Sequence, residues 1–365
     1  MKTEDFAGRI GIIQRVLPVY RAPFFDLMAE YCQGLSLFTG QPLPEEAIQT
    51  AGKLKNAQMT VTKNYHFLSP SSRFYFCYQY GINKWLENWN PEALIIEANF
   101  RYLSTPAGIR WMKNRNRPVI GWGLGAPLDR GILSGVRKNF LGQFDALIAY
   151  SNRGAEQYAA CGFPKDMIFT AFNAAAPAPV HPLPERPINP SAQPVLLFVG
   201  RLQARKRIPA LLKACASLAP LSSPRLIIVG DGPELNHLRE LAKEIYPSAE
   251  FAGEKHGAEL EKYFLAADLF VLPGTGGLAV QQAMSWGLPV IVAKGDGTQD
   301  DLVRKGNGWQ IQADDEQALL SALKEALSDR QRLQEMGAES YRIVSSEINL
   351  ERMKDVFLHV LNLQK

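Results

Sequence analysis

The sequence has few residues of the kinds that hold metals or form disulfides. Its 365 residues include four cysteines and five histidines. The cysteines lie far apart and show no paired spacing, which indicates reduced thiols rather than a disulfide framework. No cluster of His and Cys residues is present, so we expect no metal site. The four cysteines are Cys32, Cys77, Cys161 and Cys215.

Long apolar runs are also missing. Segments such as VLLFVG and LIIVG have the length of strands, far below the roughly 20 residues that span a bilayer. The N-terminal segment MKTEDFAGRI is charged and lacks the apolar core of a secretion signal. Together with the cysteine pattern, these features predict a cytoplasmic protein.

No strong excess of one charge is present, since the net charge is only +4. Residues 1–173 carry 19 Lys and Arg against 13 Asp and Glu, and residues 174–365 carry 21 against 23. The mildly basic first part is compatible with an anionic lipid or acceptor and equally with ordinary solvated side chains. It is too weak, and too poor in basic-aromatic motifs, to indicate nucleic-acid binding.

One segment nevertheless mixes apolar and basic residues. Residues 108–118, GIRWMKNRNRP, place Trp111 and Met112 among four cations. One interpretation is peripheral contact with the inner face of a membrane that carries a lipid-linked acceptor. The alternative is a helix with a buried apolar face and a solvated polar face.

The order of apolar segments predicts two α/β domains. On both sides of residues 174–194, which hold seven prolines, runs of four to six apolar residues alternate with helical patterns, as in parallel sheets. We predict two doubly wound Rossmann-like domains, residues 1–173 and 195–347, facing each other across a cleft. Residues 174–194 form the linker, and the C-terminal helix 348–365 completes the first domain. Ligands bind such sheets at the carboxyl edge, where the strand order reverses.

A diphosphate site is predicted in the second domain. The strand VLLFVG ends at Gly200, Arg201 follows it, and Lys206 lies where the next helix starts. Further along, PGTGG precedes another helix, and the N–H groups of Gly276, Gly277 and Leu278 are natural phosphate partners. Charge-assisted bonds to a diphosphate contribute about 1.5–3 kcal/mol each. The alternative is a pair of surface cations and a plain glycine turn.

Several segments together resemble the retaining glycosyltransferases of family 4, which have the GT-B fold. The resemblance covers nearly the whole second half of the chain. Single motifs are weak, but their shared order is specific. The segments are YSNRGAEQYAACGFPKDMIFTAFNAAA, GRLQARKR, LIIVGDGPE, FAGEKHGAELEKYFLAADLFVLP and QAMSWGLPVIV.

The resemblance implies a nucleotide diphosphate sugar, with uridine diphosphate favoured, as co-substrate and no other cofactor. It implies that Gly200, Arg201 and Lys206 bind the diphosphate, together with the turn formed by Thr275, Gly276, Gly277 and Leu278. It also implies that the loop holding Glu254 and Lys255 packs against the base, and that Asn173 marks the domain junction. Retention of anomeric configuration without a metal or an obligatory protein nucleophile is implied as well.

The chain departs from this family at two positions. The family has two glutamates eight positions apart, one interacting with the transferred sugar and one bonding the ribose. Here these positions read Gly274 and Gln282. One of Gln281 and Gln282 is expected to face the cleft and the other solvent, and Gln282 can still bond a ribose. Thr275, Asp300 or Asp301 are candidates to compensate for Gly274.

The first domain offers weaker candidates. Glu97 ends a predicted strand and is our candidate for an acceptor-activating base; the alternative is a structural pair with Arg101. Arg21 would lie at the edge of the predicted cleft or simply start a helix. Leu124 stands where the family often has a histidine, and His66 is a less favoured base.

These features predict a hexosyltransferase that uses a nucleotide diphosphate sugar resembling UDP-glucose, with guanosine diphosphate mannose as the main competing donor. The acceptor would be a hydroxyl of a glycan or lipid-linked molecule, in surface or extracellular polysaccharide biosynthesis. Two alternatives stay open: a GT-B nucleotide-sugar epimerase, and a non-catalytic sugar-nucleotide-binding subunit, which the missing glutamates favour.

Overall fold

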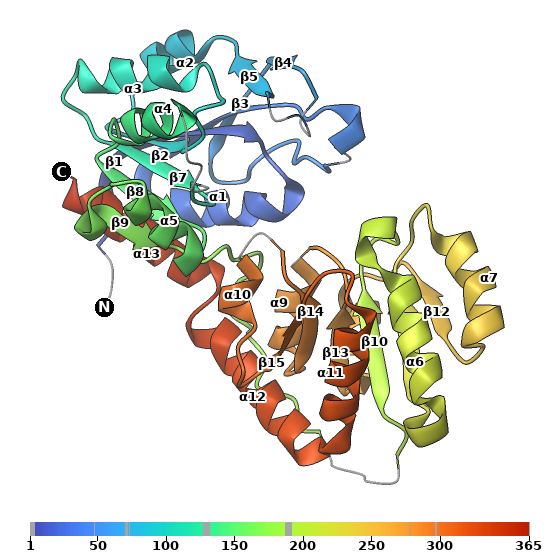
Figure 1. The fold of residues 1–365 in the computed structure, drawn as a ribbon. Helices are drawn as coiled ribbons and strands as arrows, with labels where there is room; N and C mark the ends of the chain where they lie inside the picture. The colour runs from blue at the N-terminus through green and yellow to red at the C-terminus, as the bar shows by residue number, and fades with distance from the viewer. Residues whose placement is uncertain are drawn as a thin grey trace. The chain divides into compact units, whose positions relative to one another are not determined.

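The chain forms two compact units. A computed structural model describes residues 4–46, 48–69, 72, 74–126, 132–186, 192–276, 278–295 and 298–364. Unit 1 comprises residues 1–176 and 350–365, and unit 2 comprises residues 177–349 (Figure 1). The prediction drew the boundaries at residues 173, 195 and 348, so the structure differs mainly in assigning the proline-rich segment to unit 2.

Unit 1 is built on a parallel sheet with the strand order β3-β2-β1-β6-β7-β8-β9. The reversal of order lies between β1 and β6, which pair directly. The strands are β1 (Phe6–Val16), β2 (Cys32–Gly40), β3 (Gln58–Thr62), β6 (Ala93–Glu97), β7 (Val119–Gly123), β8 (Ala146–Ala149) and β9 (Ile168–Thr170). Apolar runs produce them because both faces of such a sheet are covered.

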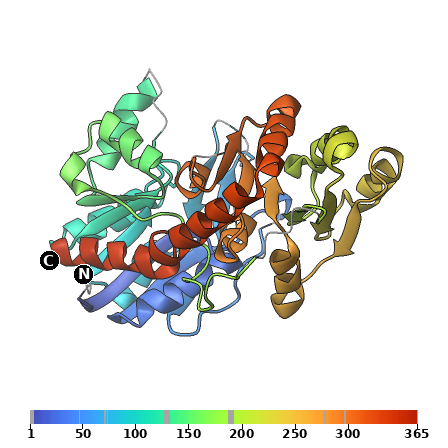
Figure 2. The same ribbon diagram turned by 90° about the horizontal axis from the view of Figure 1, so that it is seen from below.

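Helices cover both faces of this sheet. On one face, α1 (Ala22–Ala29) contacts α13 (Leu350–Leu363); on the other lie α2 (Ile82–Trp89), α3 (Thr105–Lys113) and α4 (Ile132–Leu141) (Figure 1). Helix α13 runs along β1 and β9, and both chain termini lie in this part of unit 1 (Figure 2). There the Asn362 amide donates to the carbonyl oxygen of Glu4, at 2.9 Å.

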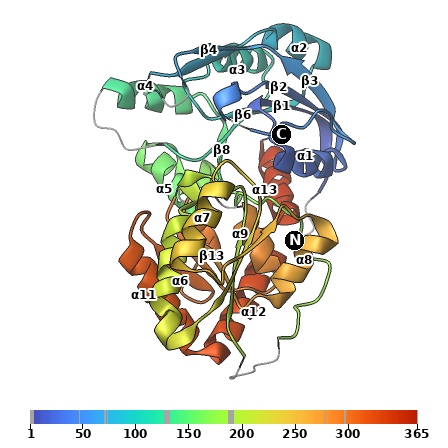
Figure 3. The same ribbon diagram turned by 90° about the vertical axis from the view of Figure 1, so that its right-hand side faces the viewer.

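A two-stranded antiparallel hairpin, which the sequence patterns did not predict, follows β3. It consists of β4 (Asn64–Phe67) and β5 (Phe76–Gln79). It is attached to the rest of unit 1 through β5, since the N–H of Cys77 donates to Arg101 and its carbonyl accepts from Leu103. The hairpin lies next to α2 and β3 at the margin of unit 1 (Figures 1 and 3).

Unit 2 has a parallel sheet with the order β12-β11-β10-β13-β14-β15. In chain order this is 3-2-1-4-5-6, the arrangement of the dinucleotide-binding Rossmann fold. The strands are β10 (Val195–Val199), β11 (Arg225–Val229), β12 (Glu250–Gly253), β13 (Leu269–Leu272), β14 (Val290–Ala293) and β15 (Gly308–Ile311). The predicted fold class, two doubly wound α/β domains, is confirmed.

The helices of unit 2 form two layers (Figure 3). On one face lie α6 (Ile208–Ser222), α7 (Leu235–Ile245) and α11 (Glu316–Ser328); on the other lie α8 (Gly257–Ala266), α9 (Leu278–Ser285) and α12 (Arg330–Ser346). Helix α6 contacts α7 and α11, and α9 contacts α12. A short helix, α10 (Thr298–Leu302), precedes β15.

The described part of the proline-rich segment is held against unit 2. The guanidinium of Arg186 donates to the backbone carbonyls of Phe264, Leu265, Ala267 and Trp286. Upstream, the His181 ring stacks on Trp286 with the ring centroids 4.0 Å apart. Arg186 thus supplies donors to backbone carbonyls of unit 2 that have no strand partner. Residues 177–186 therefore do not act as a free linker.

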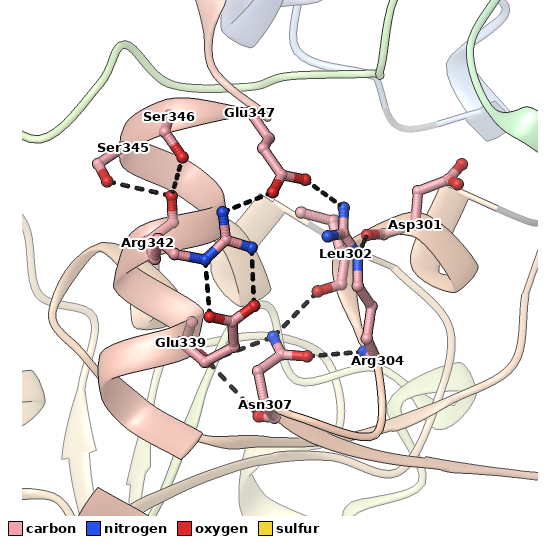
Figure 4. Close-up of polar contacts among 10 residues, drawn as sticks. Asp301, Leu302, Arg304, Asn307, Glu339, Arg342, Ser345, Ser346 and Glu347 are labelled. Atoms are coloured by element: carbon pink, nitrogen blue, oxygen red, sulfur yellow. Dashed lines mark hydrogen bonds and ion pairs between the residues drawn. The ribbon is translucent and has the colours of Figure 1, made fainter. Parts of the chain in front are cut away.

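An ion network fixes the end of α12, just before the chain returns to unit 1 (Figure 4). Glu347 accepts from Arg304 and from Arg342, each at 2.7 Å. Glu339 bonds Arg342 through both carboxylate oxygens, and Asn307 accepts from the backbone N–H of Arg304. Each pair is partly exposed, but several charges that share partners contribute more than isolated surface pairs do.

Candidate functional site

The candidate site of unit 2 lies where its strand order reverses. Strands β10 and β13 are neighbours, yet their following loops lead to helices on opposite faces, and the carboxyl edge at such a point is where sheets of this kind bind ligands. Arg201 follows β10, and the turn Gly274–Thr275–Gly276 follows β13. The structure therefore brings together the two segments that the sequence singled out.

Lys206 occupies the centre of this edge. It ends a short 3-10 helix, Ala204–Lys206, and its side chain is buried. Its Nζ atom donates to the Thr275 carbonyl at 2.7 Å. Burial, and then the charge of Arg205, lower the pKa of Lys206 to about 8. An ammonium has three donors, so two remain for an anion, whose charge would also offset the cost of burial.

The turn after β13 is packed onto the backbone that carries Lys206. The N–H of Thr275 donates to the Arg205 carbonyl at 3.1 Å. A Cβ atom at Gly274 would overlap this carbonyl oxygen and the backbone of Lys206. The family glutamate thus has no space at this position. Gly274 is required because two backbone segments meet where a side chain would stand.

Helix α9 begins directly after this turn. Leu278 is its first residue and is half exposed, whereas Gly277 lies outside the described residues. The expectation that the second glutamine lies in solvent is wrong: Gln281 is buried and donates to the carbonyl of Ile348 at 2.7 Å, because helix α9 turns it toward the interior of unit 2. Gln282 is exposed. Only Gln282 therefore remains accessible to a nucleotide.

The other predicted residues of unit 2 are less tightly placed. Arg201 is exposed, and it makes no hydrogen bond or ion pair with the described residues. Gly200, which precedes it, donates its N–H to Val229 on β11. Glu254 and Lys255 follow β12, two strands away from β10, and interact locally with His256 and Glu259. No contact in the described ranges joins this pair to Lys206.

Gln299 is a site residue that sequence reasoning missed. It lies on α10, is buried, and donates to the carbonyl of Gly276 at 3.4 Å. Its neighbour Asp301, a candidate to compensate for Gly274, is also buried, whereas Asp300 is exposed. No local pattern identifies Gln299, because α10 lies next to the turn only as a result of the order of the strands in the sheet.

The candidates of unit 1 gather where β1 and β6 end. Glu97 accepts the backbone N–H of Arg15 rather than pairing with Arg101 as the alternative had it. Burial raises the pKa of Glu97, which makes its carboxylate a stronger base than an exposed one. Arg15 itself forms a bidentate bond with Glu46 at 2.9 and 2.7 Å; sequence reasoning named neither residue.

Arg21 is buried within unit 1 rather than placed at an open edge. Its guanidinium donates to the Asn173 amide oxygen and lies 5.1 Å from the ring centroids of Tyr20 and Trp122. Asn173, expected at the domain junction, lies three residues before the unit boundary. Arg21 thus joins segments that are distant in sequence.

His66 and Leu124 are the two remaining positions of the first domain that the sequence singled out. His66 bonds the Tyr75 hydroxyl at 2.9 Å, and burial, followed by the charge of Arg15, lowers the pKa of His66. Leu124, which replaces an expected histidine, is half exposed in the loop after β7. Neither is in contact with Glu97 among the described residues. No helix within the described ranges is long and apolar enough to cross a bilayer.

The chain is similar to known glycosyltransferases. Residues 183–343 match the family described as "Glycosyl transferases group 1". A GDP-mannose-dependent alpha-mannosyltransferase of Corynebacterium glutamicum is 36% identical over 160 residues, which is 43% of this chain and 37% of that protein. The lipopolysaccharide core biosynthesis glycosyltransferase LpsE of Rhizobium meliloti is 24% identical over 307 residues, 76% of this chain and 87% of that protein. The chain thus spans little more than a third of the first relative.

Solved structures show the same fold over nearly the full chain. Anabaena HepE in complex with UDP has a TM-score of 0.69 at 17% identity, covering 97% of this chain and 99% of that one. Sucrose-phosphate synthase from Thermosynechococcus elongatus has a TM-score of 0.66 at 18% identity, covering 97% and 98%. Unit 1 and unit 2 are therefore the two Rossmann-like domains of a GT-B fold, and residues 183–343 match the glycosyl transferases group 1 family.

Proposed function

We propose that the protein is a glycosyltransferase that moves a hexose from a nucleotide diphosphate sugar to a hydroxyl of a glycan or lipid-linked acceptor, with retention. The observation that carries this proposal is the position of Lys206. Its buried ammonium is held against the turn at residues 274–276, at the point where a Rossmann sheet binds phosphates.

The diphosphate is the leaving group of this reaction, and negative charge develops on it as the glycosidic bond breaks. Lys206, Arg201 and the N-terminus of α9 stabilise that charge more in the transition state than in the ground state. Positive groups of the protein neutralise the phosphates in this mechanism, so the transfer needs no metal. Glu97 is the candidate that accepts the proton of the acceptor hydroxyl.

The donor is a nucleotide diphosphate hexose. A donor resembling UDP-glucose agrees with the UDP complex of the Anabaena protein, while the Corynebacterium relative is named for GDP-mannose. Both belong in a test. A role in surface or extracellular polysaccharide biosynthesis agrees with the name of the Rhizobium relative, a lipopolysaccharide core enzyme.

A second candidate function is a sugar-nucleotide-binding subunit without activity of its own. It is motivated by Gly274, where adjacent backbone excludes the family glutamate. Such a subunit would bind nucleotide and release no sugar from any donor.

The first experiment is a thermal-shift panel with UDP, GDP, ADP and pyrophosphate, because a ligand that binds the folded state raises the melting temperature. The donor sugar of the best nucleotide is then incubated with and without glycan and lipid-linked acceptors, and release of nucleotide diphosphate is measured. Acceptor-dependent release supports a transferase. Conversion of the donor without acceptor would indicate an epimerase, and binding without release the second candidate. No shift with any nucleotide would overturn the proposal.

A further inference from the structure

The β4–β5 hairpin of unit 1 has its faces reversed relative to an ordinary amphipathic sheet. The side that meets the protein carries Cys77 and Gln79, both buried, and His66, which bonds Tyr75. The opposite side carries large aromatic residues. In an antiparallel hairpin the apolar side normally covers a core and the polar side faces water. An exposed aromatic side and a polar buried side are therefore unusual.

Five aromatic side chains define this outer side, which we call the aromatic face. Tyr65 pairs across the hairpin with Tyr78, with ring centroids 6.5 Å apart. Phe67 lies two residues further along β4, and Phe74 and Tyr80 flank β5. The five side chains are between 38% and 65% exposed. Single exposed apolar residues are common, but a contiguous group marks a surface that another body covers.

The segment that carries this face has no acidic residue. Residues 47–86 contain no Asp or Glu and include five cations. Two of these adjoin the aromatic face: Lys63 Nζ lies 4.9 Å from the ring centroid of Tyr65, and Lys84 lines one groove together with Tyr80 and Val61. The body that covers the face therefore meets aromatic rings and positive charge without any carboxylate from this segment.

We propose that the aromatic face docks on the surface of an anionic lipid bilayer. Tyrosine rings sit at the level of lipid headgroups, phenylalanine side chains enter the boundary with the acyl chains, and neighbouring lysines attract anionic lipid by about 1 kcal/mol each. A second copy of the chain fits less well, because pairing the face with itself brings like charges together. A neutral glycan makes no use of the lysines. This inference does not depend on the glycosyltransferase proposal.

The segment that the sequence indicated for membrane contact is different, and the structure argues against it. In α3, Trp111 and Met112 are buried in the core of unit 1. Arg115 stacks on Trp111, with its Cζ atom 3.8 Å from the ring centroid, and Lys113 pairs with Asp145 at 2.5 Å. The apolar residues of this segment are therefore committed to the interior, which is the second of the two interpretations offered for it.

The test is flotation of the full chain with vesicles of phosphatidylcholine alone, and of phosphatidylcholine and phosphatidylglycerol in roughly equal parts. We expect binding to the mixed vesicles only, weakened in high salt because the charges are screened. The double variant Phe67→Ser/Phe74→Ser and the double variant Lys63→Glu/Lys84→Glu should each lower the partition coefficient at least about tenfold.

Matched control variants show whether a loss of vesicle binding is specific to this surface or follows from any change in exposed apolar area or charge. Leu265→Ser/Leu363→Ser removes two similarly exposed apolar residues, and Lys262→Glu/Lys324→Glu reverses two exposed lysines of unit 2; both should bind vesicles like the wild type. Circular dichroism and the melting temperature report that each variant is folded, and nucleotide binding by calorimetry tests the proposed function separately.

Four results would overturn the proposal. The first is a wild-type chain that ignores anionic vesicles or binds neutral ones equally well. The second is hairpin variants that bind like the wild type. The third is a wild-type dimer in sedimentation that the hairpin variants convert to a monomer without any effect on vesicles, which would identify a second copy as the occupant. Loss of turnover on a soluble glycan with unchanged vesicle binding would likewise assign the face to the acceptor.

Discussion

The ammonium of Lys206 and the carbonyl oxygen of Thr275 are joined by a hydrogen bond of 2.7 Å, although the residues lie 69 positions apart. This bond connects the loop after β10 to the turn after β13. It places a buried positive charge at the carboxyl edge of the unit 2 sheet. The predictions for unit 2 that follow depend on this connection.

Removal of the charge is the most direct test. Lys206→Met and Arg201→Ala should each weaken binding of the preferred nucleotide diphosphate by roughly 10-fold to 100-fold, the loss of one charge-assisted bond. The melting temperature of Lys206→Met should stay level or rise, since a buried cation is removed. Isothermal calorimetry measures the affinity, and Lys243→Ala, an exposed residue of α7, is the control. Unchanged affinity in both variants would remove the site.

The affinity should depend on pH through Lys206. Its pKa of about 8 means that the side chain is charged at pH 7 and largely neutral at pH 9. Nucleotide affinity should therefore fall by roughly tenfold between these values, and Lys206→Met should lose this dependence. The stability of the free protein should depend on pH in the opposite direction. Between pH 8 and the ordinary value of 10.5, the unfolded chain binds more protons at this position, so stability rises with pH. A flat affinity profile would contradict this account.

Gly274 should tolerate no side chain. Gly274→Ala is expected to lower the free energy of unfolding by about 2 kcal/mol or more, because Arg205 and Lys206 fill the space with backbone. Gly274→Glu, which restores the family residue, should be worse and should not raise activity. Gly52→Ala is the control, since no atom lies within 4 Å of its Cβ position. Chemical denaturation gives the values, and equal stability of both alanine variants would refute the argument.

The two glutamines of α9 should separate binding from stability. Gln282→Ala should weaken binding of the nucleotide but hardly affect pyrophosphate, if its amide bonds the ribose. Gln281→Ala should instead lower stability by roughly 1–3 kcal/mol, because the carbonyl of Ile348 loses a buried donor. Calorimetry with both ligands and denaturation of both variants decide the matter. Equal losses for nucleotide and pyrophosphate would place Gln282 elsewhere.

Glu97 can be tested without disturbing its surroundings. Glu97→Gln keeps an oxygen that accepts the N–H of Arg15 and removes the ability to take a proton. Turnover with the acceptor found in the panel should fall by at least about 100-fold, the typical contribution of a general base, while nucleotide affinity and melting temperature stay the same. Retained turnover would show that Glu97 is structural.

Sequence patterns predicted much of the fold for a physical reason. Strands such as β10 and β13 are buried on both faces, so their residues form continuous apolar runs that are visible locally. The hairpin β4–β5 was missed because its exposed side is aromatic and its buried side carries Cys77 and Gln79, the reverse of the expected alternation. Residues 187–191, part of the predicted linker, lie outside the described residues.

The sequence by itself determined the two α/β domains, the positions of Arg201 and Lys206 at a strand end, and the replacement of a family glutamate by Gly274. Only the tertiary structure decided that Gly274 is held against the backbone of Lys206, that Gln299 reaches the same turn, and that Trp111 is buried while Phe67 is exposed. Strand identity follows from local patterns. Which loops lie side by side at the edge of a sheet depends on the strand order. That order brings together residues about 70 positions apart, and no local sequence pattern reveals it.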